Sequence, residues 1–393
     1  MTMSGSARVA SSDAPVRAER VSSELIVIAA GGTGGHLFPA EALAAELSAR
    51  RFNLALITDA RGHPLVLTNG AVKTHRIAGG GLAGKSPWAQ AKAVLGLGFG
   101  LTEAFRLLGR LAPRVVVGFG GYASFPTVLA AILKGIPTAI HEQNAVLGRT
   151  NRLLARGAGR IATSFPATLG LPPDANARTV CTGMPVRPKV AALAGKSYQA
   201  PEAGRPISLF IVGGSQGARI FADIVPSAVA QSPEDLRRNL RINQQCRPED
   251  LERTREAYVA LGIAAELASF FEDAPERMAA AHLVIARAGA STVAELAALG
   301  RPALLVPYRH AADDHQSANA RAFVDIGAAW AIAETDLTPE SLAGLLVRRL
   351  SDPPGLARAA GLARTLARPD AARALADTIT AIISAPTAER VAP

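Results

Sequence analysis

The sequence contains a short apolar run that leads directly into a glycine-rich turn, and it repeats this pattern once. Residues Leu25–Ala30 read LIVIAA and precede Gly31–Gly35, and Ile207–Val212 read ISLFIV and precede Gly213–Gly217. A continuous apolar run of strand length is typical of a strand that is buried on both faces of a parallel sheet. Two such openings, about 182 residues apart, predict two similar α/β domains.

The residues between these openings alternate between strand and helix patterns. The first turn leads into a helix that we expect Pro39 to open, with Leu43 and Leu47 one turn apart. Further strands are expected over 54–58, 115–118, 138–140, 283–286 and 303–306, a helix over 127–134, and more helix over 355–385. This alternation predicts doubly wound parallel sheets. We expect a loose tail over 1–23, a first domain over 24–187, a Pro-, Gly- and Ala-rich linker over 188–206, a second domain over 207–365, and a C-terminal helix and tail over 366–393.

Charge is unevenly distributed along the 393 residues, whose net charge is +10. Residues 1–200 carry 22 basic and 9 acidic side chains, a net +13, whereas residues 201–393 carry 20 and 23, a net −3. The first half is therefore expected to meet an anionic partner. No apolar run reaches the roughly 18 residues of a membrane-spanning helix, so any membrane contact should be peripheral. Cys181 and Cys246 are expected to be small buried side chains in a reducing compartment.

The two glycine turns predict phosphate binding, since glycine lets a phosphate approach the backbone where a helix N-terminus offers free N–H groups. Tight strand-to-helix turns are the plain alternative. The dinucleotide fingerprint fails, because Leu37 stands where a third glycine is needed and Asp59 lies 27 residues after Gly32 instead of about 20.

Polar side chains stand at several places where α/β sheets bind ligands. His36 ends the first glycine turn at a helix N-terminus, whose dipole favours a neutral imidazole that can accept a proton; a backbone-bonding role is equally compatible. His141–Asn144 (HEQN) follows a buried strand, as a binding site or as a solvated loop. Thr292 and Glu295 have the spacing of a helix capping box.

Metal binding is not expected. His310 and His315 lie near Asp313 and Asp314, but their spacing matches no strong ligand pattern. No Asp-x-Asp pair occurs in the sequence, so the common means of holding a divalent cation on a nucleotide diphosphate is missing.

A glycine-rich stretch over 79–88 precedes a helix pattern that carries both basic and aromatic residues. Lys85, Trp88, Lys92 and Arg106 are candidates for an anchor on anionic lipid, with Phe105 on the same helix. The alternative is an ordinary amphipathic helix that packs on the sheet.

Taken together, these motifs resemble the MurG family of bacterial enzymes, which transfer N-acetylglucosamine from UDP-N-acetylglucosamine to undecaprenyl-diphospho-muramyl-pentapeptide. The matching segments occur in family order: GGTGGHLFPA (31–40), GFGGYASFP (118–126), HEQNAVLGRTN (141–151), GMPVR (183–187), VGGSQGAR (212–219), RAGASTVAEL (287–296) and PYRHAADDHQSANA (307–320). The resemblance implies a GT-B glycosyltransferase, in which two Rossmann-like domains face each other across a cleft. The first domain would bind the lipid acceptor and the second the nucleotide sugar.

The resemblance also implies roles for individual residues. His36 would be the base that deprotonates the attacking 4-hydroxyl, Glu295 would accept the ribose hydroxyls, and the backbone of Phe271 would read uracil. Ser215 would bond the diphosphate, and His315 and Gln316 would lie at the sugar hydroxyls. The remaining substrate-binding candidates are Gly32, Thr33, Gly34, Gly35, Asn144, Arg187, Gln216 and Thr292. The reaction would be inverting, would need no metal or cofactor, and would take place at the cytoplasmic face of the inner membrane, to which the protein would bind peripherally.

The sequence departs from the family pattern at three places. Met184 stands where an Asn is common, Asn243–Cys246 replaces a commoner His-Gln-Ser/Thr-Gly, and His315 stands where some relatives have Gln. A UDP-N-acetylglucosamine 2-epimerase, or a transferase with another acceptor, would share the fold. A nucleic-acid-binding protein would explain the positive charge, but the chain has no clustered basic helix and no aromatic-basic motif, so nucleic acid is not an expected partner.

Overall fold

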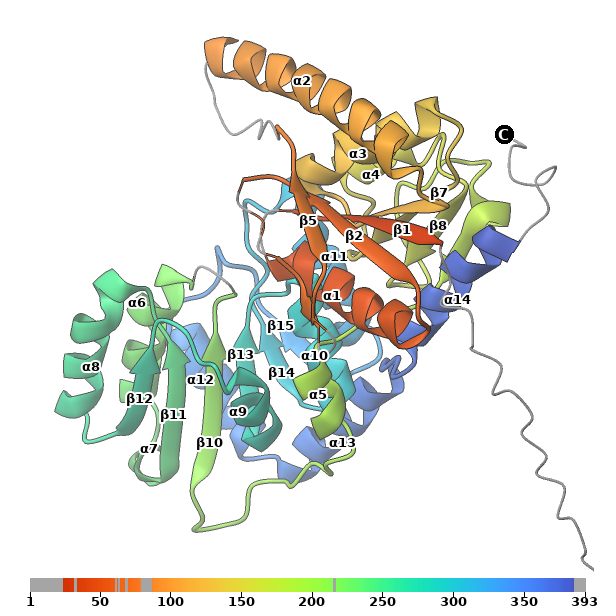
Figure 1. The fold of residues 1–393 in the computed structure, drawn as a ribbon. Coiled ribbons are helices and arrows are strands. Elements are labelled where there is room, and N and C mark those ends of the chain that lie inside the picture. Colours follow the sequence, from red (N-terminus) through yellow and green to blue (C-terminus); the bar gives the residue numbers. More distant parts are fainter. Residues whose placement is uncertain are drawn as a thin grey trace, which may run out of the picture.

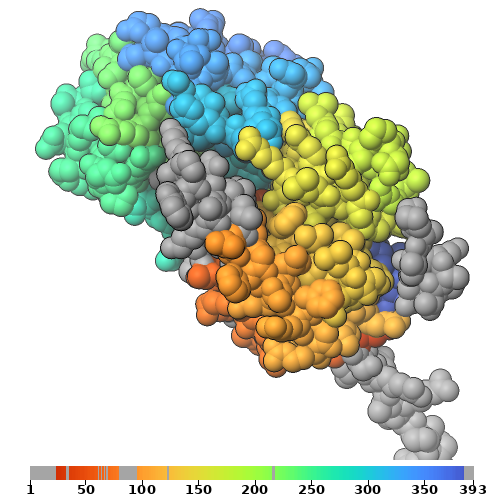
Figure 2. Space-filling view, turned by 90° about the horizontal axis from the view of Figure 1, so that it is seen from above, coloured from red at the N-terminus to blue at the C-terminus, as the bar shows by residue number. Residues whose placement is uncertain are grey.

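The computed structural model describes residues 24–31, 34–60, 62, 64–67, 70–78, 87–214 and 217–384. They form two α/β domains, seen as two lobes in Figure 2 and as two layered sheets in Figure 1. The expected tail over 1–23 lies outside the described residues. Within the described part, no helix is long and apolar enough to cross a bilayer.

Each domain is built on a parallel sheet with its first strand near the middle. The first sheet has the order β5 (Lys73–Arg76), β2 (Asn53–Thr58), β1 (Leu25–Ala29), β6 (Val115–Gly118), β7 (Thr138–Glu142), β8 (Arg160–Thr163) and β9 (Thr179–Cys181). The second has the order β12 (Ala264–Ala268), β11 (Leu240–Gln245), β10 (Ile207–Val212), β13 (Leu283–Ala286), β14 (Ala303–Leu305) and β15 (Ala329–Ala331). A short antiparallel pair, β3 (Val66–Leu67) and β4 (Gly70–Ala71), lies apart from both sheets.

Helices cover both faces of each sheet, as the apolar runs predict. In the first domain they are α1 (Gly34–Ala49), α2 (Pro87–Leu111), α3 (Gly121–Leu133) and α4 (Arg149–Leu154). In the second they are α6 (Arg219–Ala230), α7 (Glu234–Asn239), α8 (Leu251–Ala260), α9 (Ala274–Ala280), α10 (Ala290–Leu299), α11 (His315–Val324), α12 (Pro339–Leu350) and α13 (Pro353–Thr365). Three-residue 3₁₀ turns lie at Asn176–Arg178, Pro248–Asp250 and Ala312–Asp314. The prediction of two doubly wound parallel sheets is therefore confirmed.

Strand β1 shows why an unbroken apolar run is needed. Ile26 and Ile28 belong to one buried cluster with residues of α1, whereas Val27 and Ala29 belong to another with residues of α2 and α3. All four are fully buried, because alternate side chains of a strand point to opposite faces. A polar residue at any of these positions would be forced into a core.

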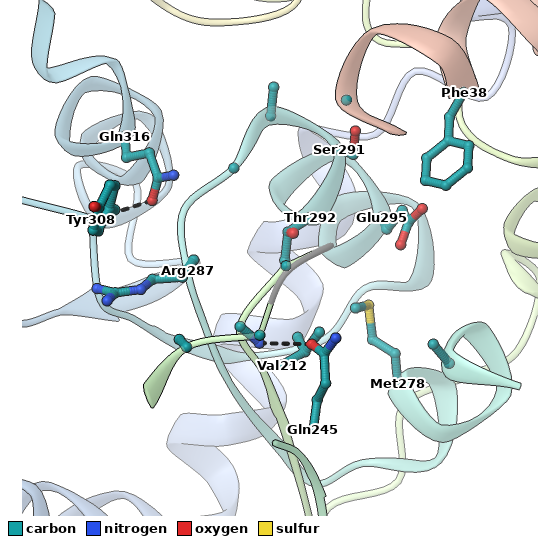
Figure 3. A pocket seen from close by; sticks show the side chains of 18 of the residues that line it. Phe38, Val212, Gln245, Met278, Arg287, Ser291, Thr292, Glu295, Tyr308 and Gln316 are labelled. Carbon is teal, nitrogen blue, oxygen red and sulfur yellow. Dashed lines mark hydrogen bonds between the residues drawn. The ribbon is translucent and has the colours of Figure 1, made fainter. Parts of the chain in front are cut away.

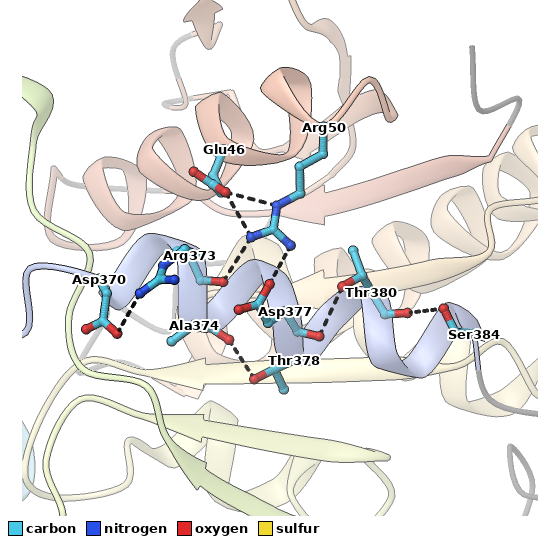
Figure 4. A network of polar contacts seen from close by, with 9 residues as sticks. All are labelled: Glu46, Arg50, Asp370, Arg373, Ala374, Asp377, Thr378, Thr380 and Ser384. Carbon is cyan, nitrogen blue, oxygen red and sulfur yellow. Dashed lines mark hydrogen bonds and ion pairs between the residues drawn. The ribbon is translucent and has the colours of Figure 1, made fainter. Parts of the chain in front are cut away.

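The last helix of the chain returns to the first domain. Helix α14 (Ala371–Ser384) packs beside α1, and Leu375 and Ile379 are fully buried against the first sheet. At the rim of this contact, Arg50, which directly follows α1, pairs with Glu46 of α1 and with Asp377 of α14 at 2.6 Å (Figure 4). The C-terminal segment expected over 366–393 therefore begins with a helix that ties the end of the chain to the first domain, and its residues 385–393 lie outside the described part.

Three expectations are corrected. Helix α1 begins at Gly34, so Pro39 is its sixth residue instead of its first; the glycine turn itself adopts the first helical turn. Helix α3 likewise begins at Gly121, six residues before the expected start, with Pro126 inside it. The stretch expected as a linker contains helix α5 (Pro188–Leu193), whose Val190 is buried in the second domain's core.

The cysteines have two different environments. Cys246 is buried, as expected, and burial raises the pKa of its thiol. Cys181 is exposed, so the prediction that it is buried is wrong. It ends β9, the edge strand of the first sheet, where one side has no neighbouring strand to cover it.

Candidate functional site

A cavity of about 680 Å³ lies between the two domains, within the size range of small-molecule sites. The first domain contributes His36 and Phe38 from α1 and Gln143 and Asn144 from the segment after β7. The second domain contributes most of the remaining wall, part of which is drawn in Figure 3. The strand order explains the position. Ligands bind beyond the carboxyl ends of parallel strands, at the point where the strand order reverses, and here both reversal points face the same cleft.

Helix N-termini surround the cavity. Gly35 lies in the first turn of α1, Gly217 and Ala218 directly precede α6, and Gly289 is the N-cap of α10; all four line the cavity. Each helix start offers unpaired N–H groups and the positive end of its dipole. The second glycine turn is sterically required, because a Cβ at Gly213 would lie 2.2 Å from the backbone nitrogen of Ala218. The cavity is therefore built to receive an anion from several directions.

Four arginines and two glutamates line this cavity, namely Arg187, Arg219, Arg247, Arg287, Glu295 and Glu334. Both glutamates are held by arginines. Arg287 is 8% exposed and donates to Glu334 at 2.8 Å. Burial alone would raise the pKa of Glu334, but the hydrogen bonds from Arg287 and from the backbone N–H of Arg309 bring it below its usual value. The excess of cations suits a phosphate-bearing ligand.

Arg187, which directly precedes α5, and Glu295 of α10 form a bidentate ion pair in the wall of the cavity. Arg187 donates from Nε to one carboxylate oxygen at 2.7 Å and from Nη2 to the other at 2.9 Å. Glu295 is only 6% exposed, and burial raises the pKa of its carboxyl against the lowering effect of Arg187. The capping box predicted for Thr292 and Glu295 is wrong, because the N-cap of α10 is Gly289 and no side chain caps this helix.

The side chains of His141, Gln143 and His36 form a chain of hydrogen bonds that ends at His36. Nδ1 of His36 is 3.0 Å from Oε1 of Gln143, and Nε2 of Gln143 is 3.1 Å from Nδ1 of His141. Nε2 of His141 is 3.2 Å from the carbonyl oxygen of Gly183. Burial lowers the pKa of His141 to about 4, so this imidazole is neutral at physiological pH.

Glu142 organises the turn that carries Asn144. It is 2% exposed, and its carboxylate accepts hydrogen bonds from the backbone N–H groups of Asn144 (3.0 Å) and Gly148 (2.9 Å) and from the side chain of Asn151 (2.8 Å). His141 and Glu142 are thus the last residues of β7, and the Glu142 carboxylate holds the turn that follows them.

Asn319 joins this turn to the second domain. From α11 its Oδ1 accepts from the backbone N–H of Ala145 at 2.8 Å, and its Nδ2 donates to Oδ1 of Asn144 at 3.1 Å and to the carbonyl of Ala288 at 3.0 Å. Its side chain is fully buried. One amide thus sets the position of the HEQN turn relative to the start of α10.

The far end of the cavity is aromatic. Phe271 is 6% exposed, with its ring centroid 5.9 Å from that of Phe210 and the guanidinium of Arg277 at 4.3 Å from its centroid. Gln245, which belongs to the segment that departs from the family pattern, accepts from the backbone N–H of Gly213 at 3.1 Å (Figure 3). It therefore supports the glycine turn and lines the cavity as well.

Comparisons with known proteins agree with this architecture. The sequence models of the glycosyltransferase family 28 N-terminal and C-terminal domains match residues 26–163 and 208–374. The UDP-N-acetylglucosamine–N-acetylmuramyl-(pentapeptide) pyrophosphoryl-undecaprenol N-acetylglucosamine transferase of Paramagnetospirillum magneticum is 55% identical over 91% of this chain and 97% of its own length. The protein of the same name from Rhodospirillum centenum is 55% identical over 90% and 93%. The crystal structure of MurG from Acinetobacter baumannii covers 91% of this chain and 99% of its own, at 31% identity and a TM-score of 0.72.

The chain belongs to the MurG family. The resemblance seen in its motifs is thereby confirmed, as is the GT-B fold of family 28 glycosyltransferases. Among the residues that the resemblance implied, nine line the interdomain cavity: Gly35, His36, Asn144, Arg187, Phe271, Thr292, Glu295, His315 and Gln316. Gly34 begins α1. Gly32, Thr33, Ser215 and Gln216 lie outside the described residues.

Some side chains at the MurG site were not found from the sequence. Arg287, Tyr308, Glu334 and Asn319 come from four separate places in the second domain, and no local spacing connects them. Tyr308 donates its backbone N–H to Oε1 of Gln316 at 2.9 Å, so it orients a predicted residue (Figure 3). Two of these residues could have been found from their position relative to the strands. Arg287 follows β13 and Glu334 follows β15, so both lie at the carboxyl ends of strands, where α/β sheets bind ligands. No group of metal-ligating side chains occurs in the described part of the chain.

We predict that Asn319→Ala lowers the free energy of unfolding by about 2–4 kcal/mol, because two buried backbone groups and Asn144 lose their partner. Urea unfolding measures this loss. Asn239→Ala is the matched control: its side chain makes one surface hydrogen bond, to the carbonyl of Asp235, and should change stability by no more than about 0.5 kcal/mol. Equal losses in the two variants would show that the interdomain amide contributes nothing.

Proposed function

We propose that this chain transfers N-acetylglucosamine from UDP-N-acetylglucosamine to the 4-hydroxyl of the muramyl residue of undecaprenyl-diphospho-muramyl-pentapeptide. The relatives at 55% identity are named for this transfer and match over nearly their full length. The single structural observation that supports it is the interdomain cavity, which combines a histidine of the first domain with an arginine-rich, helix-capped wall of the second.

His36 is the proposed base. The acceptor oxygen attacks C1 of the sugar from the side opposite UDP while His36 takes the hydroxyl proton, and the bond from C1 to the diphosphate oxygen breaks with its electron pair leaving on UDP. The side chain lies on the first-domain wall of the cavity, which is the side expected for the acceptor.

The departing diphosphate is stabilised by groups that are already in place. The starts of α6 and α10 offer N–H groups, and Arg247 and Arg287 line the same wall. The two lining carboxylates are held in ion pairs by Arg187 and Arg287, so they are not arranged to coordinate a cation. We therefore propose a metal-independent reaction.

The donor and acceptor sides follow the two domains. Phe271 and Glu295 are proposed to contact uracil and ribose, Ser215, Gln216 and Thr292 the diphosphate side, and His315 and Gln316 the sugar hydroxyls. Gly32, Thr33, Gly34 and Gly35 are proposed to face the acceptor and phosphates, with Asn144 and Arg187 between the substrates. If Glu295 binds the ribose hydroxyls, its bidentate pair with Arg187 must loosen, because both its oxygens are occupied.

We predict that the protein converts labelled UDP-N-acetylglucosamine and the lipid-linked muramyl pentapeptide to a disaccharide product with a β linkage, at a rate that EDTA leaves unchanged. Inversion of the α-linked donor gives the β product. Thin-layer chromatography and proton NMR measure transfer and anomeric configuration. An α linkage, or transfer that requires added metal, would contradict an inverting, metal-independent reaction, and release of free sugar without acceptor transfer would contradict the acceptor assignment.

The first domain is also proposed to bind the anionic cytoplasmic face of the inner membrane. Helix α2 extends beyond the sheet in Figure 1, and Leu95, Phe99 and Phe105 on it are 64%, 68% and 41% exposed. Leu95 and Phe99 are four positions apart and Phe99 and Phe105 six, and Arg106 and Arg110 follow on the same helix. Their opposite neighbours Ala104, Leu107 and Leu108 are buried, so the helix both packs on its domain and exposes an apolar stripe.

This stripe shifts the predicted anchor along the helix. Lys85 lies outside the described residues, and the side chains of Trp88 and Lys92 are not described. The exposed apolar residues Leu95, Phe99 and Phe105, with Arg106 and Arg110, provide the combination of apolar contact and positive charge that favours an anionic surface.

We predict that the double variant Leu95→Gln, Phe99→Gln binds vesicles containing anionic lipid about 10–100-fold more weakly, since two exposed apolar side chains no longer enter the interface. Vesicle sedimentation measures binding, and UDP affinity should remain unchanged. Val259→Gln, a change at a 71% exposed position on α8 of the second domain, is the control. Unchanged vesicle binding by the double variant would place the anchor elsewhere.

A further inference from the structure

The line of side chains from Gly183 to His36 determines where the protons are. It begins at the carbonyl oxygen of Gly183, which can only accept, 3.2 Å from Nε2 of His141. His141 is fully buried and neutral, with its pKa lowered to about 4 by burial. A neutral imidazole has one N–H and one bare nitrogen. His141 must therefore carry its proton on Nε2, which leaves Nδ1 as an acceptor.

The second link fixes the orientation of an amide. Nε2 of Gln143 is 3.1 Å from the bare Nδ1 of His141 and 2.9 Å from the carbonyl oxygen of the same residue. Both of these partners are acceptors, so each of them needs the NH₂ group of the Gln143 amide as a donor. In the flipped orientation the amide oxygen would face two acceptors, which is unfavourable. Gln143 is 2% exposed, so these protein groups are its main partners. Its Oε1 must consequently point to His36.

The hydrogen bond between Gln143 and His36 then determines which nitrogen of the candidate base carries the proton. Oε1 of Gln143 is an acceptor and lies 3.0 Å from Nδ1 of His36, so that nitrogen must donate. When the His36 imidazole is neutral, its only proton is then on Nδ1 and Nε2 is bare. Within the described part of the chain, Nε2 of His36 has no hydrogen-bond partner.

A pair of glycines keeps the bare nitrogen accessible. A Cβ at Gly121 would lie 3.3 Å from Cδ2 of His36 and 3.5 Å from Nε2, and one at Gly120 would lie 3.6 Å from Cε1. Both glycines have positive φ, of 75° and 80°, which side chains disfavour. At these two positions the imidazole ring therefore lies against backbone that carries no side chain.

We propose that Gln143 and His141 are positioning residues that hold His36 in the form with its proton on Nδ1, so that Nε2 is free to take the proton of the acceptor hydroxyl. This inference rests on the proposed role of His36 as the base. After the transfer, His36 carries protons on both nitrogens and still donates from Nδ1 to the neutral amide. The proton on Nε2 is then released to solvent, which restores the starting form.

The direct test is nitrogen-15 NMR of the histidine-labelled full-length protein without substrate, at mildly alkaline pH, where imidazoles are neutral. Chemical shifts and two-bond couplings distinguish protonated from bare ring nitrogens, and a His36→Asn sample identifies the signals among the seven histidines. We expect His36 with Nδ1 protonated and Nε2 bare, and His141 with Nε2 protonated. A His36 with its proton on Nε2 overturns the proposal and needs no variant to show it.

Two variants test whether Gln143 is the cause. Gln143→Met removes the acceptor and should move the His36 proton to Nε2 in a large share of molecules, with kcat falling about 10- to 100-fold. Gln143→Glu keeps an acceptor oxygen and should retain the proton on Nδ1. Gln244→Met is the matched control, because Gln244 is fully buried in the second sheet, where it accepts from Tyr258 at 2.6 Å; it should leave the His36 signals unchanged.

The outcomes separate this inference from the function on which it rests. If Gln143→Met leaves the His36 signals unchanged, Gln143 does not hold the tautomer and the proposal fails. If the signals change as expected but kcat stays equal to that of Gln244→Met, the side chains hold the tautomer and His36 is not the base. If Gln143→Met changes the His36 signals and also lowers kcat, the results support both the tautomer proposal and the role of His36 as the base.

Discussion

The convergence of two parallel sheets on one cleft is the constraint on which the rest of this molecule depends. In a parallel sheet, helices begin where strands end, so the carboxyl edge collects unpaired N–H groups and the turns that carry polar side chains. Strand β1 lies between β2 and β6, and β10 lies between β11 and β13. The strand order reverses at β1 and at β10, which opens a crevice at each of these points. The two crevices face each other, and the cavity between them receives groups from both domains.

The domains are held in this arrangement by a few buried polar contacts and by the returning C-terminal helix. Asn319 is fully buried and makes three hydrogen bonds, two of them to the first domain. Arg149 and Arg152 at α4 of the first domain lie 3.5 and 3.7 Å from the carboxylate of Asp313 in the second domain, and the Arg187–Glu295 pair lines the cavity between the domains. Buried polar groups are costly when unpaired, so a change in the angle between the domains would break specific contacts. A donor that binds Glu295 and Arg187 would exchange some of these contacts for its own, which links donor binding to the domain arrangement.

Much of the architecture could be predicted from the sequence because it depends on local patterns. The LIVIAA and ISLFIV runs and their glycine turns correctly indicated two parallel sheets. The strands that were missed are edge or near-edge strands, such as Lys73–Arg76 and Ala264–Ala268, which are half-buried and partly polar and so lack the apolar run. The start of α1 was misplaced because Pro39 was taken to mark the first turn, whereas Gly34 and Gly35 are already helical. Helix α3 begins at Gly121, six residues before its expected start.

The site was predictable only where one segment carries several of its groups. The HEQN segment and the glycine turns could be read along the chain, but Arg287 with Glu334, 47 positions apart, and Asn144 with Asn319, 175 positions apart, meet only in the folded protein. Glu295 illustrates the same limit. Its spacing from Thr292 suggested a helix cap. In the structure it lies within α10, makes a bidentate contact with Arg187 and lines the cavity.

The most direct measurement for the account as a whole is the single-turnover rate of sugar transfer by His36→Ala, set beside its dissociation constant for UDP-N-acetylglucosamine. His36 lies on the acceptor side of the cavity, while the donor is assigned to the wall of the second domain. The account predicts a rate lower by about 10²–10⁴-fold, the usual contribution of a positioned base, with donor affinity nearly unchanged. A variant that transfers the sugar at a near-normal rate would contradict it.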